Sequence, residues 1–273
     1  MNLRRLMDEA LKIADLKKEP FDTGIILDGE NINRVLIGVD METPELLLAK
    51  ELGFDAVVSH HPHAGSPTID FSKVMDVQID RMMTFGVPIN RAQKALKKKQ
   101  QSVDISSHVS NYDRTSSAAE LMKLPYMNIH LPADLIGERV VQNYLDDCFR
   151  DVPKARLKDV IVALKEMDAY KGVLAGPVIR VGGENDFAGK IAVLFAGGTN
   201  GGADVYKAYF DAGVGTIVAM HVPEDVKKSV EEQNYGNVIV AGHMASDSIG
   251  LNAIVNHWRS LGVEVVTMSG ILK

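Results

Sequence analysis

Histidine is concentrated in one short stretch of the chain, VVSHHPHAG at residues 57–65. This stretch holds His60, His61 and His63, three of the eight histidines in the sequence, directly after an apolar run. Neutral imidazole is the commonest metal ligand among side chains, and compact histidine clusters with carboxylates nearby are typical of metal sites. The alternative is a polar loop whose rings only hydrogen-bond to nearby backbone. Two adjacent histidines with a third close by favour metal binding.

A second group of candidate ligands lies in GHMASD at residues 242–247. His243 follows the apolar run VIVAG and precedes a helical pattern, and Asp247 comes four residues later. Side chains four apart share one face of a helix, so both can serve one site. Asp247 or Ser246 acting only as a helix cap is the alternative. In combination with His243 and the first histidine cluster, Asp247 is favoured as a ligand.

Further histidines and one aspartate are weaker candidates. The stretch SHVSNYD supplies His108 and Asp113, although Asp113 also suits an Asx turn before the next helix. His221 ends the apolar run TIVAMH and is a candidate at the same sheet edge; a lone histidine there is more often an ordinary surface residue. We assign structural roles to His130 and His257, which fall in a loop and in a helix.

The first histidine cluster is positioned by a predicted strand–helix–strand unit. A buried strand at 35–39 is followed by a helix that starts at Thr43 and Pro44 and stops at Gly53, and then by a strand at 55–59. In open α/β sheets, ligands bind beyond the carboxyl ends of the strands. The histidines follow such an end, so their position also favours a binding site.

The rest of the chain predicts an α/β fold made of two interlinked α/β lobes with a helical insertion. We expect an N-terminal α/β lobe at 1–125, a helical insertion at 126–172 and a C-terminal α/β lobe at 173–273. The glycine-rich stretch AGGTNGGAD at 196–204 follows a strand and precedes a helix. Such a stretch can cradle a phosphate, but a tight strand-to-helix turn explains it equally well.

Composition narrows the classes of function. The chain has 273 residues, of which 46% are hydrophobic and 24% charged, and a net charge of -6, so bulk charge argues against nucleic-acid binding. Cys148 is the only cysteine, which excludes an internal disulfide and a thiolate metal cluster. Metal ligands must then be His, Asp and Glu, as in hydrolytic or Lewis-acid sites. No signal peptide or membrane-spanning run is recognisable, and we expect a cytoplasmic protein.

Two segments resemble a known family. GVDMETPELLLAKELGFDAVVSHHP is similar to the N-terminal signature of the Ngg-interacting-factor-three-like proteins, also described as dinuclear metal centre proteins or GTP cyclohydrolase 1 type 2. KIAVLFAGGTNGGADVYKAYFDAGVGTIVA and GHMASD resemble the strand, glycine turn, helix and Gly-His-x-x-x-Glu motif of its second half. The resemblance covers both ends of the chain and leaves out the helical segment at 125–170.

The resemblance implies two divalent metal ions between two α/β lobes and assembly into a ring-shaped homohexamer. By position, His60, His61, His243 and Asp247 would be ligands. The family's middle aspartate follows a histidine by four positions, so its assignment to Asp113 requires one additional residue after His108. Asp247 stands where the family usually has glutamate, and His221 where it tends to have Gly-Glu.

From these residues we expect a dinuclear metal-dependent hydrolase of a nucleotide or another phosphorylated small molecule. The ligand types suit Zn, Mn, Fe or Mg without choosing among them. GTP cyclohydrolase activity is a narrower enzymatic alternative that the resemblance implies. A non-catalytic, metal-stabilised ring scaffold or interaction protein is the alternative from another class, because the sequence reveals no general acid and no specificity pocket.

Overall fold

The computed structural model describes residues 1–272, and the chain forms two compact units. Unit 1 combines residues 1–74, 102–136 and those from 247 onward, and unit 2 combines 75–101 and 137–246. Each unit is therefore assembled from separate stretches of chain, whereas the sequence predicts a linear division. Each unit contains one mainly parallel sheet and several helices, which confirms the predicted α/β class. The chain passes from one unit to the other between α4 (Phe71–Val74) and α5 (Val77–Thr84). It also does so within three helices, α6 (Ile89–Ser107), α8 (Leu131–Phe149) and α12 (His243–Ser260).

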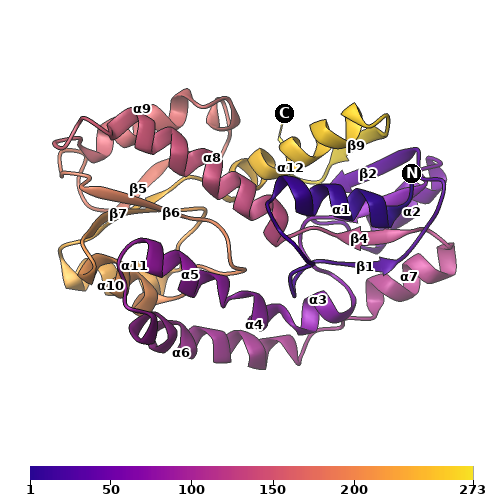
Figure 1. The fold of residues 1–273 in the computed structure, drawn as a ribbon, viewed down its shortest axis with the longest axis horizontal. Coiled ribbons are helices and arrows are strands. Elements are labelled where there is room, and N and C mark those ends of the chain that lie inside the picture. The colour runs from indigo at the N-terminus through magenta and orange to yellow at the C-terminus, as the bar shows by residue number, and fades with distance from the viewer. Residues whose placement is uncertain (273) are drawn as a thin grey trace. The chain divides into compact units, whose positions relative to one another are not determined.

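The five-stranded sheet of unit 1 has the order β1-β4-β3-β2-β9 (Figure 1). Strands β2, β3, β4 and β9 are parallel to their neighbours, and β1 is antiparallel to β4. The carboxyl ends of β2, β3 and β4 and the beginning of β1 therefore lie at one edge of the sheet. The strands are β1 (Gly24–Leu27), β2 (Arg34–Gly38), β3 (Ala56–Ser59), β4 (Tyr126–Asn128) and β9 (Glu264–Met268).

Both faces of this sheet are covered by helices, which explains why its central strands read as continuous apolar runs. Successive residues of a strand point to opposite faces. Val35 and Ile37 therefore join a core with α1 and α12, whereas Leu36 joins a second core with α2 and α7. The helices that belong wholly to unit 1 are α1 (Leu3–Ile13), α2 (Thr43–Glu51), α3 (Gly65–Ile69), α4 (Phe71–Val74) and α7 (Arg114–Met122).

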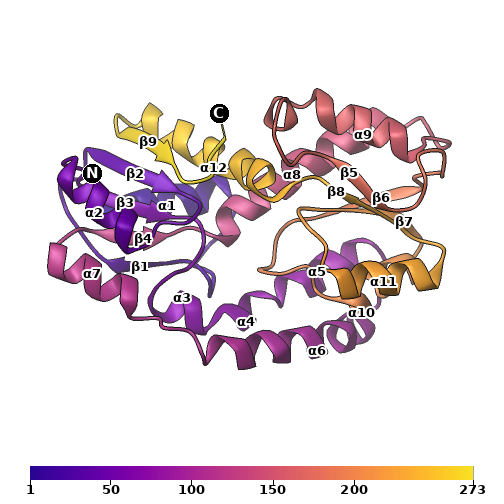
Figure 2. The ribbon, with the colours of Figure 1, turned by 180° about the vertical axis from the view of Figure 1, so that it is seen from behind.

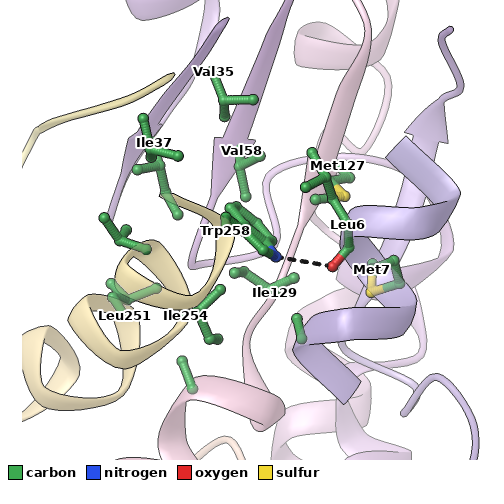
Figure 3. Close-up of a cluster of buried hydrophobic side chains, with 14 of the residues drawn as sticks. Leu6, Met7, Val35, Ile37, Val58, Met127, Ile129, Leu251, Ile254 and Trp258 are labelled. Carbon is green, nitrogen blue, oxygen red and sulfur yellow. Dashed lines mark hydrogen bonds between the residues drawn. The ribbon is translucent and has the colours of Figure 1, made fainter. Parts of the chain in front are cut away.

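Trp258 of α12 lies at the centre of the first core and ties that helix to α1 (Figure 3). It is fully buried, and its Nε1–H donates a hydrogen bond of 3.1 Å to the Leu6 carbonyl. A buried indole N–H requires such an acceptor, so this hydrogen bond holds α12 against α1. The same core includes Met7 of α1, Leu251 and Ile254 of α12, and Val58, Met127 and Ile129 in or beside the strands.

The strand–helix–strand unit predicted for 35–59 is present as β2, α2 and β3. The helix begins at Thr43, as predicted, with Pro44 in its first turn. The residue that caps it is Glu42, whose backbone N–H donates to the Glu45 carboxylate at 2.8 Å. Gly53 follows the helix with a positive φ of 72°, a conformation that glycine adopts without strain.

Unit 2 has a four-stranded sheet with the order β5-β8-β7-β6 (Figure 2). Strands β6, β7 and β8 are parallel, and β5 is antiparallel to β8. The strands are β5 (Val178–Val181), β6 (Lys190–Leu194), β7 (Val214–Ala219) and β8 (Asn237–Val240). The helices that belong wholly to this unit are α5 (Val77–Thr84), α9 (Leu157–Glu166), the 3₁₀ helix η1 (Asp168–Tyr170), α10 (Ala203–Asp211) and α11 (Glu224–Gln233).

The glycine-rich stretch after β6 forms the turn into α10. Gly197 has a φ of +101°, and the Gln78 side-chain amide donates hydrogen bonds of 2.8 Å to the carbonyls of Gly197 and Thr199. A β-carbon on Gly197 would lie 2.5 Å from Gln78. The glycine at this position is thus explained by backbone geometry and by packing against Gln78.

Within residues 1–272, no helix combines the length and the apolar composition that crossing a membrane requires.

Candidate metal centre

Polar side chains gather at the edge of the unit 1 sheet where β2, β3 and β4 end. Asp40 follows β2, His60 and His61 follow β3, and His130 follows β4. Asp22 precedes β1, which runs in the opposite direction and so begins at the same edge. Four neighbouring strands therefore bring together residues that are far apart in the sequence.

His60 is fully buried, and its two ring nitrogens have different surroundings. Nδ1 lies 3.0 Å from the Ile129 carbonyl and donates its proton there. In the neutral ring, Nε2 is then an acceptor, and it lies 3.3 Å from Asp134 Oδ1 and 3.7 Å from Asp247 Oδ1. His60 Nε2 and Asp134 Oδ1 have no hydrogen-bond partner in the described chain. With a neutral His60, three acceptors face one another here, an arrangement that a bound cation would satisfy.

The buried carboxylates also change the proton affinity of the ring. Burial lowers the pKa of His60, but Asp134 and Asp247 outweigh it, so that the pKa lies well above its ordinary value. The two carboxylates therefore favour the protonated ring, and a divalent ion that binds to His60 Nε2 would compete with a proton there, as is general for metal ligands.

The two carboxylates come from the N-terminal parts of two helices. Asp134 lies in α8 and Asp247 in α12, and they are 3% and 1% exposed. Buried carboxylates are costly unless they are paired or coordinate a metal. A β-carbon on Gly250 would lie 1.9 Å from the Ala133 carbonyl oxygen, so glycine is needed where α12 passes the start of α8.

His61 faces the same carboxylate from the other side. Its Nε2 lies 4.0 Å from Asp247 Oδ2, and its Nδ1 lies 2.7 Å from Asp40 Oδ1. The two oxygens of Asp247 are thus directed to different histidines. The hydrogen bond from His61 and a second from His63 lower the pKa of Asp40 to about 2, so Asp40 is ionised and holds the ring of His61 through Nδ1.

His63, the third histidine of the opening motif, lies on the outer side of this group. Its Nε2 is 3.1 Å from Asp40 Oδ1, and its Nδ1 is 3.8 Å from Glu42 Oε1. His63 therefore shares the Asp40 carboxylate with His61, whose Nε2 faces Asp247.

Three clusters in unit 1 bring potential ligand atoms within 4.8 Å of one another. They are His60–Asp134–Asp247, His60–His61–His130 and Asp40–His61–His63. The first cluster is fully buried and combines imidazole with two carboxylates, a donor set that suits Zn, Mn, Fe and Mg. These clusters could hold metal ions and support the assignment of a metal-binding protein.

His243 begins α12, one helical turn before Asp247, and belongs to unit 2. Its ring is exposed and lies edge-to-face against His221, with centroids 5.1 Å apart. His221 is a weaker candidate by sequence, and the two rings are neighbours within their unit. The role of His243 as a ligand stays a prediction.

Asp113 lies just before α7, is exposed, and accepts hydrogen bonds from the hydroxyls of Ser116 and Ser117. Among the described residues it belongs to none of the clusters of three or more His, Cys, Asp or Glu side chains that could hold a metal ion. His108 is likewise exposed and outside those clusters.

Sequence reasoning missed Asp22, His130 and Asp134. The signal for two of them is present in the sequence, because Asp134 follows His130 by four positions, the spacing that the family resemblance implies for its middle aspartate. The prediction from the sequence is Asp113 instead, which follows His108 by five positions. Asp22 gives no such signal, since only the pairing of β1 with β4 brings it to the site.

Comparison with known proteins gives a match over the whole chain. A NIF3 superfamily protein from Sphaerobacter thermophilus is 36% identical, with a TM-score of 0.95, over 99% of this chain and 98% of that one. HcgD from Methanocaldococcus jannaschii is 16% identical with a TM-score of 0.60, and its match covers 98% of this chain and 97% of that one. A Bacillus cereus protein related to NIF3 is 11% identical with a TM-score of 0.53, covering 98% and 96%. These two more distant structures share the fold.

No family model and no curated protein matches the sequence. The full-length similarity to the Sphaerobacter thermophilus structure confirms the resemblance found in the two motif-bearing segments. The chain belongs to the NIF3 superfamily.

Proposed function

We propose that this protein binds two divalent metal ions and uses them to hydrolyse a nucleotide or another phosphorylated small molecule. The observation that carries the proposal is the meeting of His60 Nε2 with Asp134 and Asp247 at 3.3 and 3.7 Å in a buried site. Both separations fit around one ion, because donors about 2.1 Å from the same ion are at most about 4.2 Å apart.

A second ion is supported by the two oxygens of Asp247, which face His60 and His61 separately. A carboxylate placed in this way can bridge two cations. Two metals about 3.5–4 Å apart can activate a water and stabilise both the attacking and the leaving oxygen of a phosphoryl group. His243, one turn before Asp247 on α12, remains a predicted further ligand.

The protein's own groups would prepare the ligands. The Ile129 carbonyl and the Asp40 carboxylate accept hydrogen bonds from the Nδ1–H groups of His60 and His61, so that each Nε2 can give its lone pair to a metal ion. Such outer partners fix the tautomer and the ring orientation of metal-bound histidines.

The ligand assignment can be tested by metal content per chain in matched variants. Asp134→Ala should lose bound metal, whereas Asp113→Ala should retain it, because Asp113 is exposed and satisfied by two serine hydroxyls. Loss of metal in Asp113→Ala with full metal in Asp134→Ala would instead support the sequence-based choice of Asp113.

Catalysis is tested by turnover of a panel of phosphoesters and nucleotides, GTP included, with Zn, Mn, Fe or Mg restored to metal-free protein. Metal-dependent turnover supports the hydrolase, and ring opening of GTP would support the narrower cyclohydrolase alternative. A protein that melts when metal is removed, and turns over no substrate in any metal form, would be the metal-stabilised scaffold.

We also propose a homohexamer, on the basis of the family resemblance. Light scattering at micromolar concentration should give about six times the 29.8 kDa mass of the chain. A monomer under these conditions would contradict the proposal.

A further inference from the structure

His130 and Asp22 form a buried pair beside the metal site. His130 Nδ1 lies 2.6 Å from Asp22 Oδ2, and Asp22 is fully buried. The Thr23 hydroxyl donates to the other Asp22 oxygen at 3.2 Å and accepts the His130 backbone N–H at 3.1 Å. Both the ring and the backbone of His130 are therefore held by the segment that leads into β1.

This hydrogen bond decides where the second ring nitrogen points. With Nδ1 bound to Asp22, Nε2 lies 3.8 Å from Asp134 Oδ2. The ring centroid is 4.7 Å from that of His60 and 5.5 Å from that of His61. The Phe71 ring lies 5.4 Å away and adds a further contact to the imidazole.

The distances suit a shared ion. One nitrogen from each of His60, His61 and His130 lies within 4.8 Å of the other two. Because two donors on one ion are at most about 4.2 Å apart, shifts below about 1 Å would bring these three nitrogens within that limit.

A purely structural role is the competing explanation, and the chain contains a pair that illustrates it. His257 Nε2 lies 2.9 Å from Glu9 Oε2 in the same unit, and neither residue belongs to a cluster of described residues that could hold a metal ion. The two pairs differ in the surroundings of the other ring nitrogen. In His130 this nitrogen, Nε2, faces the buried carboxylate of Asp134.

We propose that His130 is a further metal ligand, through Nε2, and that Asp22 is its positioning residue. This inference rests on the proposed function, since it requires that the site binds a metal ion. Asp22 accepts a hydrogen bond from Nδ1–H of His130. It thereby fixes the tautomer in which Nε2 carries the lone pair that can bind a metal ion. A carboxylate in this position makes a metal-bound imidazole a better donor, and its loss typically costs 10–100-fold in metal affinity.

Proton NMR of the full chain loaded with Co²⁺ tests the proposal without any substrate. A histidine bound through Nε2 shows its exchangeable Nδ1–H as a strongly shifted resonance near the paramagnetic ion. His130→Ala should remove one such resonance. Asp22→Asn should keep it, accelerate its exchange with water, and weaken Co²⁺ binding by roughly 10–100-fold. His257→Ala, the matched control, should change neither the resonances nor the affinity.

The full set of shifted resonances in His130→Ala, with wild-type affinity for Co²⁺, would overturn the inference. If circular dichroism shows that His130→Ala does not fold, the Asp22→Asn variant provides the test. A wild-type Co²⁺ affinity and a wild-type rate of Nδ1–H exchange in Asp22→Asn would then overturn the proposal. Failure of the wild-type protein to bind Co²⁺ would overturn the proposed function itself. This outcome is seen in the wild-type protein alone, so it cannot be confused with a failure of the inference about His130.

Discussion

Gly250 on α12 faces the carbonyl oxygen of Ala133 on α8 so closely that a β-carbon on Gly250 would lie 1.9 Å from it. Asp247 lies nearly one turn earlier on α12, and Asp134 directly follows Ala133. The glycine therefore permits the approach of two helix segments that carry the buried carboxylates facing His60. A packing detail outside the cluster thus contributes to its geometry.

Gly250→Ala should destabilise the protein and weaken metal binding together. The added methyl has no space against Ala133, and overpacking of this kind typically costs about 1–3 kcal/mol, although alanine is the better helix former by about 1 kcal/mol. Urea unfolding and metal titration measure the two effects. Asn256→Ala, at an exposed position of the same helix, should leave both unchanged. Wild-type metal affinity in Gly250→Ala would show that the close approach is irrelevant to the site.

Asp40→Ala should reduce metal affinity by roughly 10–100-fold, the usual cost of losing an outer carboxylate, without unfolding the protein. The Asp40 side chain is 56% exposed and contributes mainly by orienting His61. Competition with a chromophoric chelator gives the affinity. His63→Ala is the comparison, because it removes the other partner of Asp40 and leaves the His61 contact in place. Equal affinities in all three proteins would mean that Asp40 does not orient a ligand.

The strand–helix–strand unit that positions His60 and His61 could be predicted from the sequence. Thr43, Pro44 and Gly53 mark the ends of α2, and the apolar runs on either side mark two strands. The order of these residues alone therefore places His60 and His61 at a strand end. These signals lie within about thirty residues of one another, and short-range backbone preferences are sufficient to read them.

The remainder of the site depends on strand order, which no local signal contains. His130 and Asp134 become relevant because β4 lies beside β3, and Asp22 because β1 pairs antiparallel with β4. The assignment of Asp113 rests on the family resemblance, with one additional residue after His108. The structure places Asp113 before α7 among serine hydroxyls, whereas His130 and Asp134 have the spacing of four without an additional residue.

Asp211 in unit 2 gives a prediction for the pH dependence of stability. Hydrogen bonds from the Tyr235 hydroxyl and Lys207, together with Arg91, lower the pKa of Asp211 to about 2. An unfolded aspartate titrates near about 3.9, so its stabilising contribution is present above that pH and is lost as the pH falls through the folded value. Asp211→Asn should therefore lower the urea midpoint at about pH 7, and the difference from wild type should shrink between about pH 4 and pH 2. A constant difference would exclude ionisation of Asp211 as the cause.

The last prediction concerns the length of the side chain at position 247. Asp247 Oδ2 lies 4.0 Å from His61 Nε2, whereas His60 Nε2 and Asp134 Oδ1 in the buried cluster are 3.3 Å apart. Because donors on one ion are at most about 4.2 Å apart, the His61 side is near that limit. We expect one ion to be bound tightly on the His60 side and a second to be bound loosely and lost on purification.

Asp247→Glu adds one methylene and should raise the occupancy of the second position, whereas Asp247→Ala should reduce metal binding at both. Elemental analysis per chain, before and after dialysis, measures the occupancy. Asp113→Glu makes the same change at an exposed position and should have no effect. If Asp247→Ala keeps its full metal content, Asp247 is only a residue of the first turns of α12 and does not bridge two ions.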